Sequence, residues 1–199
     1  MKTRNILMIA TVCTFTLLSV NMRSAQAQTD TPKIEVGGQF SLLNFNAFAL
    51  DGHRRDEYGG GGRVTFNFQK YVAAEAQLDY FPQTDSDRIG AIVVPRFGGK
   101  TLGVFGVKAG ARGKRFGVFG KARPGFIHFS SVPVFACVAA PCPQPAKTNF
   151  AFDLGGVFEY YPTSRTMVRF DIGDTIIHHQ RYFGTSHNAQ ISAGVGVRF

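Results

Sequence analysis

The stretch VAAEAQLDY, residues 72–80, alternates apolar and polar side chains over most of its length. Successive side chains of a β-strand point to opposite faces, so one face of this segment is apolar while the other carries Glu75, Gln77 and Asp79. The stretch therefore predicts a strand whose two faces meet different environments.

Seven further segments repeat this alternation, with lengths close to the roughly 9–11 residues that a tilted strand needs to cross a membrane. They are 33–43, 58–69, 101–111, 115–129, 150–161, 166–173 and 188–199. In the 115–129 segment, Pro124 cannot donate a ladder hydrogen bond, so we expect a bulge or a strand end there.

The segment 101–111 can be oriented in two ways. Either Phe105, Val107 and Ala109 or Leu102 and Val104 face the apolar environment. Lys108 lies on the face opposite to Phe105 and favours the first orientation.

The connections between these segments alternate in length. Short links fall at 70–71, 112–114 and 162–165, and long links fall at 44–57, 82–100, 130–149 and 174–187. Outer-membrane barrels have an even number of strands, short periplasmic turns and longer external loops. The sequence therefore predicts an all-β fold, an eight-stranded antiparallel up-and-down transmembrane β-barrel.

The N-terminus has the pattern of a cleaved signal peptide. Lys2 and Arg4 precede a mostly apolar stretch at 6–20, and Ala25 and Ala27 frame a small-x-small cleavage site. The stretch is too short to span a membrane as a helix. We expect residues 1–27 to be the signal peptide and residues 28–199 to form the barrel domain.

The net charge of the mature chain is modest. The whole sequence carries +9, and three of the basic residues lie in 1–27, which leaves 9 − 3 = +6. The basic residues are spread along the strands, so nucleic acid is not an expected partner, whereas anionic lipid headgroups are.

The charges on the polar faces of the strands nearly balance. An eight-stranded barrel is only wide enough for side chains to fill, so in a membrane these charges would pair across the lumen and close it to solutes. The expected lumen network contains Arg63, Glu75, Asp79, Lys121, Arg123, Asp153, Glu159, Arg169 and Asp171, together with Glu35, Lys108, Arg115 and Arg198. We expect low or no conductance.

Two cysteines remain after the signal peptide, Cys137 and Cys142, in the Pro-rich 133–145 stretch. In an exported chain they are expected to form a disulfide that closes a small loop. A metal site is the less favoured alternative, because no His or Asp lies close by in the sequence.

The last ten residues, QISAGVGVRF, end in Phe199 after apolar residues at alternate positions. This segment resembles the C-terminal strand that the outer-membrane assembly machinery recognises, and the chain is similar to small OmpA-like and OmpX-like outer-membrane barrels. The resemblance implies a bacterial outer-membrane location, contact with outer-membrane lipid and lipopolysaccharide, transient binding to the barrel-assembly machinery, and a role for Phe199 as an assembly signal.

The chain departs from that family in having no Trp. Aromatic residues near strand ends are then expected to mark the two membrane interfaces. They are Tyr58, Tyr71, Tyr80, Phe81, Tyr160, Tyr161 and Tyr182.

One pair of residues suggests hydrolysis. His128 and Ser130 would share a strand face, as in lipid A deacylases, and an imidazole there could act as general base for the hydroxyl. A carboxylate should orient the His, and the nearest candidates on the next strand are Asp153 and Glu159.

Three histidines, His178, His179 and His187, fall in the predicted 174–187 loop. Neutral imidazole binds zinc or copper, but no acid or Cys completes a ligand set here, and adjacent residues of an extended chain point in opposite directions. We expect no metal and no cofactor.

Three functions remain after these considerations. The favoured hypothesis is a non-enzymatic barrel that supports envelope integrity or binds an unknown surface ligand through four external loops. The alternatives are a lipid A-modifying hydrolase that uses His128 and Ser130, and a periplasmic lipocalin-like carrier, which would be soluble and have an apolar interior.

Overall fold

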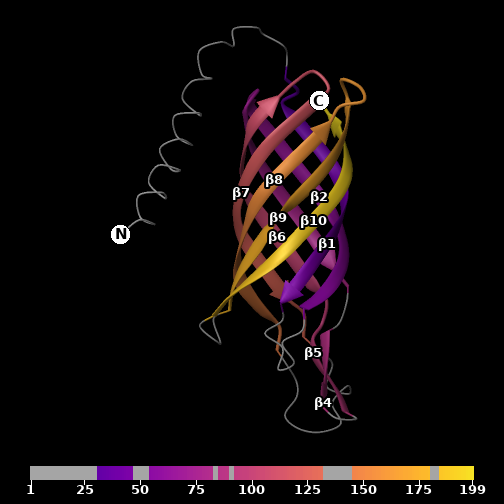
Figure 1. Ribbon diagram of the computed structural model, residues 1–199, viewed down its shortest axis with the longest axis vertical. Helices are drawn as coiled ribbons and strands as arrows, with labels where there is room; N and C mark the ends of the chain where they lie inside the picture. Colours follow the sequence, from indigo (N-terminus) through magenta and orange to yellow (C-terminus); the bar gives the residue numbers. More distant parts are fainter. Residues whose placement is uncertain (1–30, 47–53, 83–84, 90–91, 132–144, 180–183) are drawn as a thin grey trace, which may run out of the picture. The chain divides into compact units, whose positions relative to one another are not determined.

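The computed structural model describes residues 31–46, 54–82, 85–89, 92–131, 145–179 and 184–199. Within these ranges no helix is long and apolar enough to cross a membrane. Eight strands form one closed barrel (Figure 1). They are β1 (Ile34–Asn46), β2 (Arg54–Gln69), β3 (Val72–Phe81), β6 (Lys100–Arg112), β7 (Phe116–Phe129), β8 (Lys147–Tyr160), β9 (Thr166–His179) and β10 (Gly184–Arg198).

Every neighbouring pair of strands in the barrel is antiparallel, in the order β1-β10-β9-β8-β7-β6-β3-β2. The predicted fold class is therefore confirmed. The first and last strands close the barrel, and the backbone N–H of Phe199 donates to the carbonyl oxygen of Ile34 over 2.8 Å.

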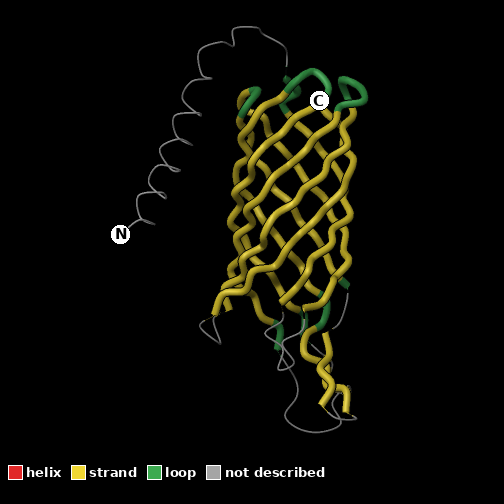
Figure 2. Tube along the Cα trace, in the orientation of Figure 1, coloured by secondary structure: helices red, strands yellow, loops and turns green. Residues whose placement is uncertain are grey.

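The strands are staggered as well as paired. Paired residues followed around the barrel lead from Asn44 on β1 back to Ile34 on the same strand, a displacement of 44 − 34 = 10 residues. A stagger of this size tilts the strands against the barrel axis, by about 40° in typical barrels, and Figure 2 shows the resulting slanted lattice. Eight strands with this tilt enclose an interior that side chains can fill.

The two ends of the barrel differ, as expected. One end, here called the turn end, holds the short connections 70–71, 113–115 and 161–165 (Figure 2). The opposite loop end holds the connections 47–53, 82–99, 130–146 and 180–183. The 82–99 connection contains a separate two-stranded sheet of β4 (Asp85–Ile89) and β5 (Ile92–Phe97), which the sequence analysis did not predict.

The prediction of four long loops is wrong in one place. β9 continues to His179 and β10 begins at Gly184, so the connection predicted at 174–187 has only four residues. The predicted boundary fell at Asp174, the first outward polar residue after Ile172. Inward side chains nevertheless keep the period of two, with Thr175 and Ile177 both buried, and the strands therefore extend past the apolar band.

Pro124 neither ends β7 nor causes a bulge, which corrects a second expectation. The register of β6 against β7 is the same before and after it, from Val104 paired with Gly125 to Val107 paired with Ala122. Only the two residue pairs between these positions are missing from the pairing of β6 with β7. Proline removes one donor, and the long strand tolerates that local loss.

The barrel is apolar outside and polar inside. Large apolar side chains on the outer wall are strongly exposed, such as Phe105 at 64% and Ile172 at 65%, whereas Arg123 and Arg169 are completely buried. On β6, Phe105 and Val107 are outward while Leu102 and Val104 are buried, as Lys108 had indicated.

Two aromatic residues that were expected at the membrane interfaces point inward instead. Phe81 is 0% exposed and Tyr161 is 4% exposed, whereas Tyr58, Tyr71 and Tyr80 are each exposed by more than a third. Tyr182 lies outside the described residues. Phe81 follows Tyr80 directly, and Tyr161 follows Tyr160, so alternation turns one ring of each pair inward, which the expectation did not take into account.

Candidate functional site in the barrel interior

The centre of the lumen is a carboxylate shared by two arginines. Glu75 on β3 accepts hydrogen bonds from Arg123 on β7 and from Arg169 on β9, the latter over 2.8 Å from Nη2 to Oε1. Thr65 on the neighbouring β2 adds a hydroxyl donor at 3.1 Å. Since β3, β7 and β9 are not adjacent in the barrel, these contacts cross the interior.

Two further carboxylates complete this layer. Arg123 Nε donates to Asp153 Oδ2 over 2.8 Å, and Arg169 Nη2 donates to Asp171 Oδ1 over 2.7 Å. Lys121 bridges the two acids, at 3.1 Å from Asp153 and 3.4 Å from Asp171. Each cation therefore faces at least one carboxylate, the pairing that buried charges require.

Arg63 joins this layer from β2. Its Nη1 donates to the side-chain oxygen of Gln39 over 2.8 Å and lies 3.8 Å from Asp171 Oδ2. The contact with Asp171 again crosses from one side of the barrel to the other.

A second charged layer lies nearer the turn end and centres on Glu159. Lys108 contacts Glu159 directly and lies 3.4 Å from Glu35. Arg112 contacts Glu35 at 3.0 Å and Glu159 at 3.4 Å. Arg198 also pairs with Glu35, at 3.2 Å. Arg112 was missed in the sequence because it fell in a predicted turn.

Tyr161, in the 161–165 turn, covers this layer. Its hydroxyl donates to Glu159 over 2.6 Å, and the Arg198 guanidinium lies 4.0 Å from the ring centroid. Burial, with the nearby negative charge of Glu159, raises the pKa of the Tyr161 phenol above its ordinary value. The phenol is therefore a protonated donor at neutral pH.

Asp79 has a different environment from the other inward acids. Its carboxylate accepts from the amides of Gln39 at 2.9 Å and Gln77 at 2.7 Å, and from the Ser41 hydroxyl at 3.0 Å. The Gln190 amide is a fourth donor, at 3.3 Å. In the described part of the chain its direct hydrogen-bond donors are neutral, so Asp79 stands outside the ion pairs.

An apolar layer lies inside the barrel near the loop end. Nine buried apolar residues from six strands pack together there, namely Leu43, Phe45, Phe81, Leu102, Val104, Ile127, Phe129, Ala151 and Ile177. We call this group the apolar plug. The predicted lumen network was wholly charged. Although the favoured orientation of 101–111 turned Leu102 and Val104 inward, an apolar layer was not predicted.

An ion pair adjoins the plug. Lys100 Nζ lies 2.6 Å from Glu57 Oε1, and the two side chains are 0% and 2% exposed. The same ammonium group lies 5.3 Å from the Phe45 ring centroid. Both ionic residues were placed in predicted loops, so sequence reasoning missed them.

His128 and Ser130 do not form the predicted hydrolytic arrangement with an acid. His128 Nδ1 lies 2.8 Å from the Thr148 hydroxyl, on the outer side of the wall. Asp153 and Glu159 are both 0% exposed and are held by cations inside the lumen. The two proposed orienting acids therefore lie on the opposite face of the sheet from the histidine.

The three histidines of the predicted loop lie on strands and do not converge. His179 is buried and lies 2.9 Å from the Ser186 hydroxyl, while His178 is exposed on the outer wall. His187, also exposed, contacts the carboxylate of Asp174. Within the described ranges no group of three or more His, Cys, Asp or Glu side chains has the arrangement of a metal site.

The remaining predicted site residues lie at the edges of the structure. Arg115, which was expected in the lumen, is instead exposed in the 113–115 turn. Cys137 and Cys142 fall outside the described residues, and so does the 1–27 segment. Phe199 is 71% exposed at the turn end beside Ile34. Its role in assembly stays a prediction.

Comparison with known proteins agrees with this architecture. The family model of the outer membrane protein beta-barrel domain matches residues 13–199. No curated protein matches the chain.

Several solved structures are similar in fold. Neisserial surface protein A has a TM-score of 0.57 and 11% identity, with coverage of 86% of this chain and 100% of that one. The outer membrane protein OprG of Pseudomonas aeruginosa has a TM-score of 0.49 and 11% identity, with coverage of 85% and 97%. The N-terminal barrel domain of OprF from the same organism has a TM-score of 0.48 and 13% identity, with coverage of 85% and 100%.

Proposed function

The chain belongs to the outer membrane protein β-barrel family, and from this premise we propose that it is a non-conducting, non-enzymatic barrel of the bacterial outer membrane. It would stabilise the envelope with its rigid wall and present the loop end to the cell exterior. The observation that carries the proposal is the occupied interior, in which two charged layers and the apolar plug lie in series.

The two kinds of layer resist solutes for different reasons. The charged layers hold their cations and carboxylates in direct contact, such as Arg169 with Glu75 and Lys108 with Glu159. Water or an ion can enter only if these pairs separate, which leaves buried charges without partners. The apolar plug offers no hydrogen-bond partner to water.

The loop end provides the surfaces on which recognition would take place. The connections 82–99 and 130–146 are the longest of the barrel, and the first contains the β4–β5 hairpin. Loops on a rigid scaffold are where binding residues concentrate. A surface ligand is therefore the natural partner to seek, together with the lipid and lipopolysaccharide around the wall and the barrel-assembly machinery during biogenesis.

The two alternatives have less support. A lipocalin-like carrier requires an apolar interior and a polar exterior, the reverse of the observed distribution. For a lipid A hydrolase that uses His128 and Ser130, the two proposed orienting carboxylates, Asp153 and Glu159, face the lumen instead.

Conductance tests the proposal directly. The refolded wild-type barrel should give no stable open level in planar lipid bilayers, while a wide porin reconstituted in parallel conducts. Insertion of the barrel is checked by a heat-modifiable gel shift of the same sample. Large and long-lived channels from the inserted barrel would contradict a sealed lumen.

A further inference from the structure

Four consecutive glycines, Gly59 to Gly62 on β2, have two different environments. Gly59 and Gly61 face inward, where a Cβ at Gly61 would lie 2.0 Å from the Leu78 carbonyl oxygen and one at Gly59 would lie 2.5 Å from the Phe81 ring. No other residue fits at these two positions without displacing backbone or ring atoms. The fold itself therefore explains Gly59 and Gly61.

The outward glycines have no such explanation. A Cβ at Gly60 would meet its nearest atom, the Gln39 carbonyl oxygen, at 3.4 Å, and a Cβ at Gly62 would meet only the Gly37 carbonyl oxygen at 3.8 Å. Larger side chains fit there, and bulky apolar residues are usual on this face. By contrast, the site beside outward Gly103 on β6 is filled by the Phe126 ring, at 2.7 Å.

The two outward glycines form the floor of a groove on the outer wall. The groove has a volume of about 750 Å³, and its sides include the apolar side chains of Val36, Val64 and Leu78, with Tyr80 at one end. Pockets of roughly 300–1,000 Å³ are typical of small-molecule sites. The described part of the chain leaves this space on the lipid-facing wall open.

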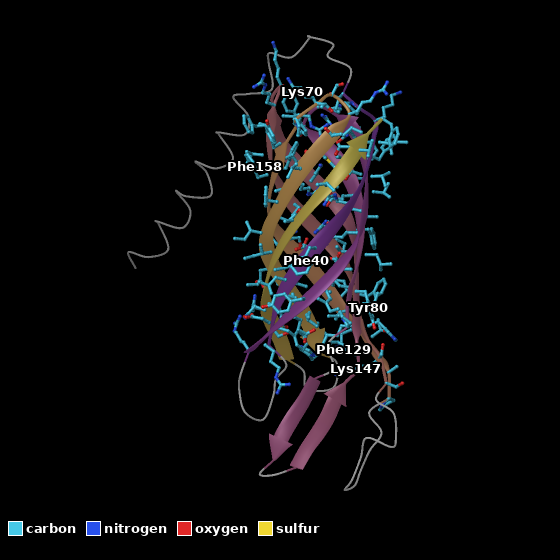
Figure 3. The ribbon with its side chains drawn as sticks, turned by 90° about the vertical axis from the view of Figure 1, so that its right-hand side faces the viewer. Phe40, Lys70, Tyr80, Phe129, Lys147 and Phe158 are labelled. Carbon is cyan, nitrogen blue, oxygen red and sulfur yellow. The ribbon has the colours of Figure 1, made fainter. Side chains whose placement is uncertain are left out.

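The groove runs from Val36 and Val64 to Tyr80, and its Tyr80 end lies in the half of the wall near the loop end. Tyr80 pairs with Gly60, and Figure 3 shows Tyr80 toward the end that holds Phe129 and Lys147, far from Lys70 in the 70–71 turn. With the loop end outside the cell, this half contacts the outer leaflet. In a bacterial outer membrane that leaflet is built from lipopolysaccharide, whose lipid A portion carries phosphates and acyl chains.

A cation lies on the same outward row of β2, beyond the groove. Arg54 is exposed, six residues from Gly60 or about 20 Å along the strand. Its Nη1 donates to Asn44 Oδ1 over 3.1 Å, and the same Asn44 donates from Nδ2 to Asp56 over 2.6 Å. Asn44 therefore lies between the Arg54 guanidinium and the Asp56 carboxylate and hydrogen-bonds to both. A guanidinium group is well suited to binding phosphate.

We propose that this groove binds one acyl chain of lipid A, with the lipid A phosphate near Arg54. The groove has room for the acyl chain because Gly60 and Gly62 lack side chains. Arg54 lies further toward the loop end, where the phosphate of the same lipid would be. The site depends on the membrane location of the barrel and not on whether its lumen conducts.

A matched pair of glycine variants tests the site. Gly62→Leu fills the groove. Gly156→Leu on β8 is the control, because it adds the same side chain at another outward glycine that does not line the groove, where a Cβ would lie 4.0 Å from its nearest atom. Native mass spectrometry measures lipid A retained by each folded barrel in detergent. We expect wild type and Gly156→Leu to retain one lipid A, and Gly62→Leu to bind it at least tenfold more weakly.

Further arms of the same experiment identify the occupant. Arg54→Gln should weaken lipid A binding severalfold and leave binding of uncharged lipid unchanged. The proposal is overturned if both leucine variants retain lipid A equally, or if phosphatidylglycerol is retained as well as lipid A and is equally sensitive to Gly62→Leu. It is also overturned if wild type is a dimer by light scattering and Gly62→Leu is a monomer, since a second barrel would then be the occupant.

Discussion

The Glu75 carboxylate pairs with the guanidinium groups of Arg123 and Arg169 across the lumen. Removing its charge should leave each arginine with one ionic partner fewer. Breaking a buried ion pair on one side typically costs about 3–5 kcal/mol. We therefore expect Glu75→Gln to lower the free energy of unfolding by about that amount, measured by urea titration of the barrel in lipid vesicles.

Asp79 provides the matched control, because it is buried like Glu75 but its hydrogen-bond donors are the neutral side chains of Gln39, Ser41, Gln77 and Gln190. Asp79→Asn changes the acid without leaving a directly paired cation behind. Its expected cost is about 1–2 kcal/mol. Equal losses for the two variants would show that the cross-lumen pairs add nothing beyond ordinary hydrogen bonds.

The same two residues show the limit of sequence reasoning at this scale. The period of two predicted that both would face inward, and both are buried. It could not predict their partners, because which side chains meet across the lumen depends on the stagger of strands that are distant in sequence. Lys100, Glu57 and Arg112 were missed for a different reason, since each lies one residue outside a predicted strand and was assigned to a connection.

At the scale of elements, the strands were predictable and their ends were not. All eight barrel strands were recognised from alternation, yet β9 and β10 extend several residues beyond the predicted boundaries. The outward residues become polar there, so the apolar signal stops before the hydrogen-bonded ladder does. The β4–β5 hairpin is a separate sheet outside the barrel. A search for transmembrane strands therefore could not predict it.

The independence of that hairpin leads to a prediction. Among the described residues, β4 and β5 pair with each other and with no barrel strand. Replacing residues 83–98 with a short Gly-rich turn should leave the barrel folded, with the same heat-modifiable gel shift and a midpoint of thermal unfolding within a few degrees of wild type. Loss of the folded band would mean that the hairpin helps to hold β3 against β6.

At the scale of the whole molecule, the fold requires one face of the sheet to contact lipid and the other to face the lumen. The sequence was sufficient to predict a polar interior and an apolar exterior, because tilted strands in an eight-stranded barrel leave no other arrangement for these side chains. It was not sufficient to predict the apolar plug or the outer groove. The plug is formed by inward residues of several strands and the groove by outward residues of neighbouring strands, and the sequence does not show which of these residues meet.

A single fluorophore can test this arrangement, since the chain has no Trp. Phe105→Trp places a probe on the outer wall, where Phe105 is 64% exposed, and Phe119→Trp places one in the lumen, where Phe119 is 4% exposed. Each variant is refolded into vesicles that contain lipids with brominated acyl chains. We expect strong quenching at position 105 and little at position 119. Equal quenching at both positions, or the reverse order, would contradict an apolar outer wall around a lipid-free interior.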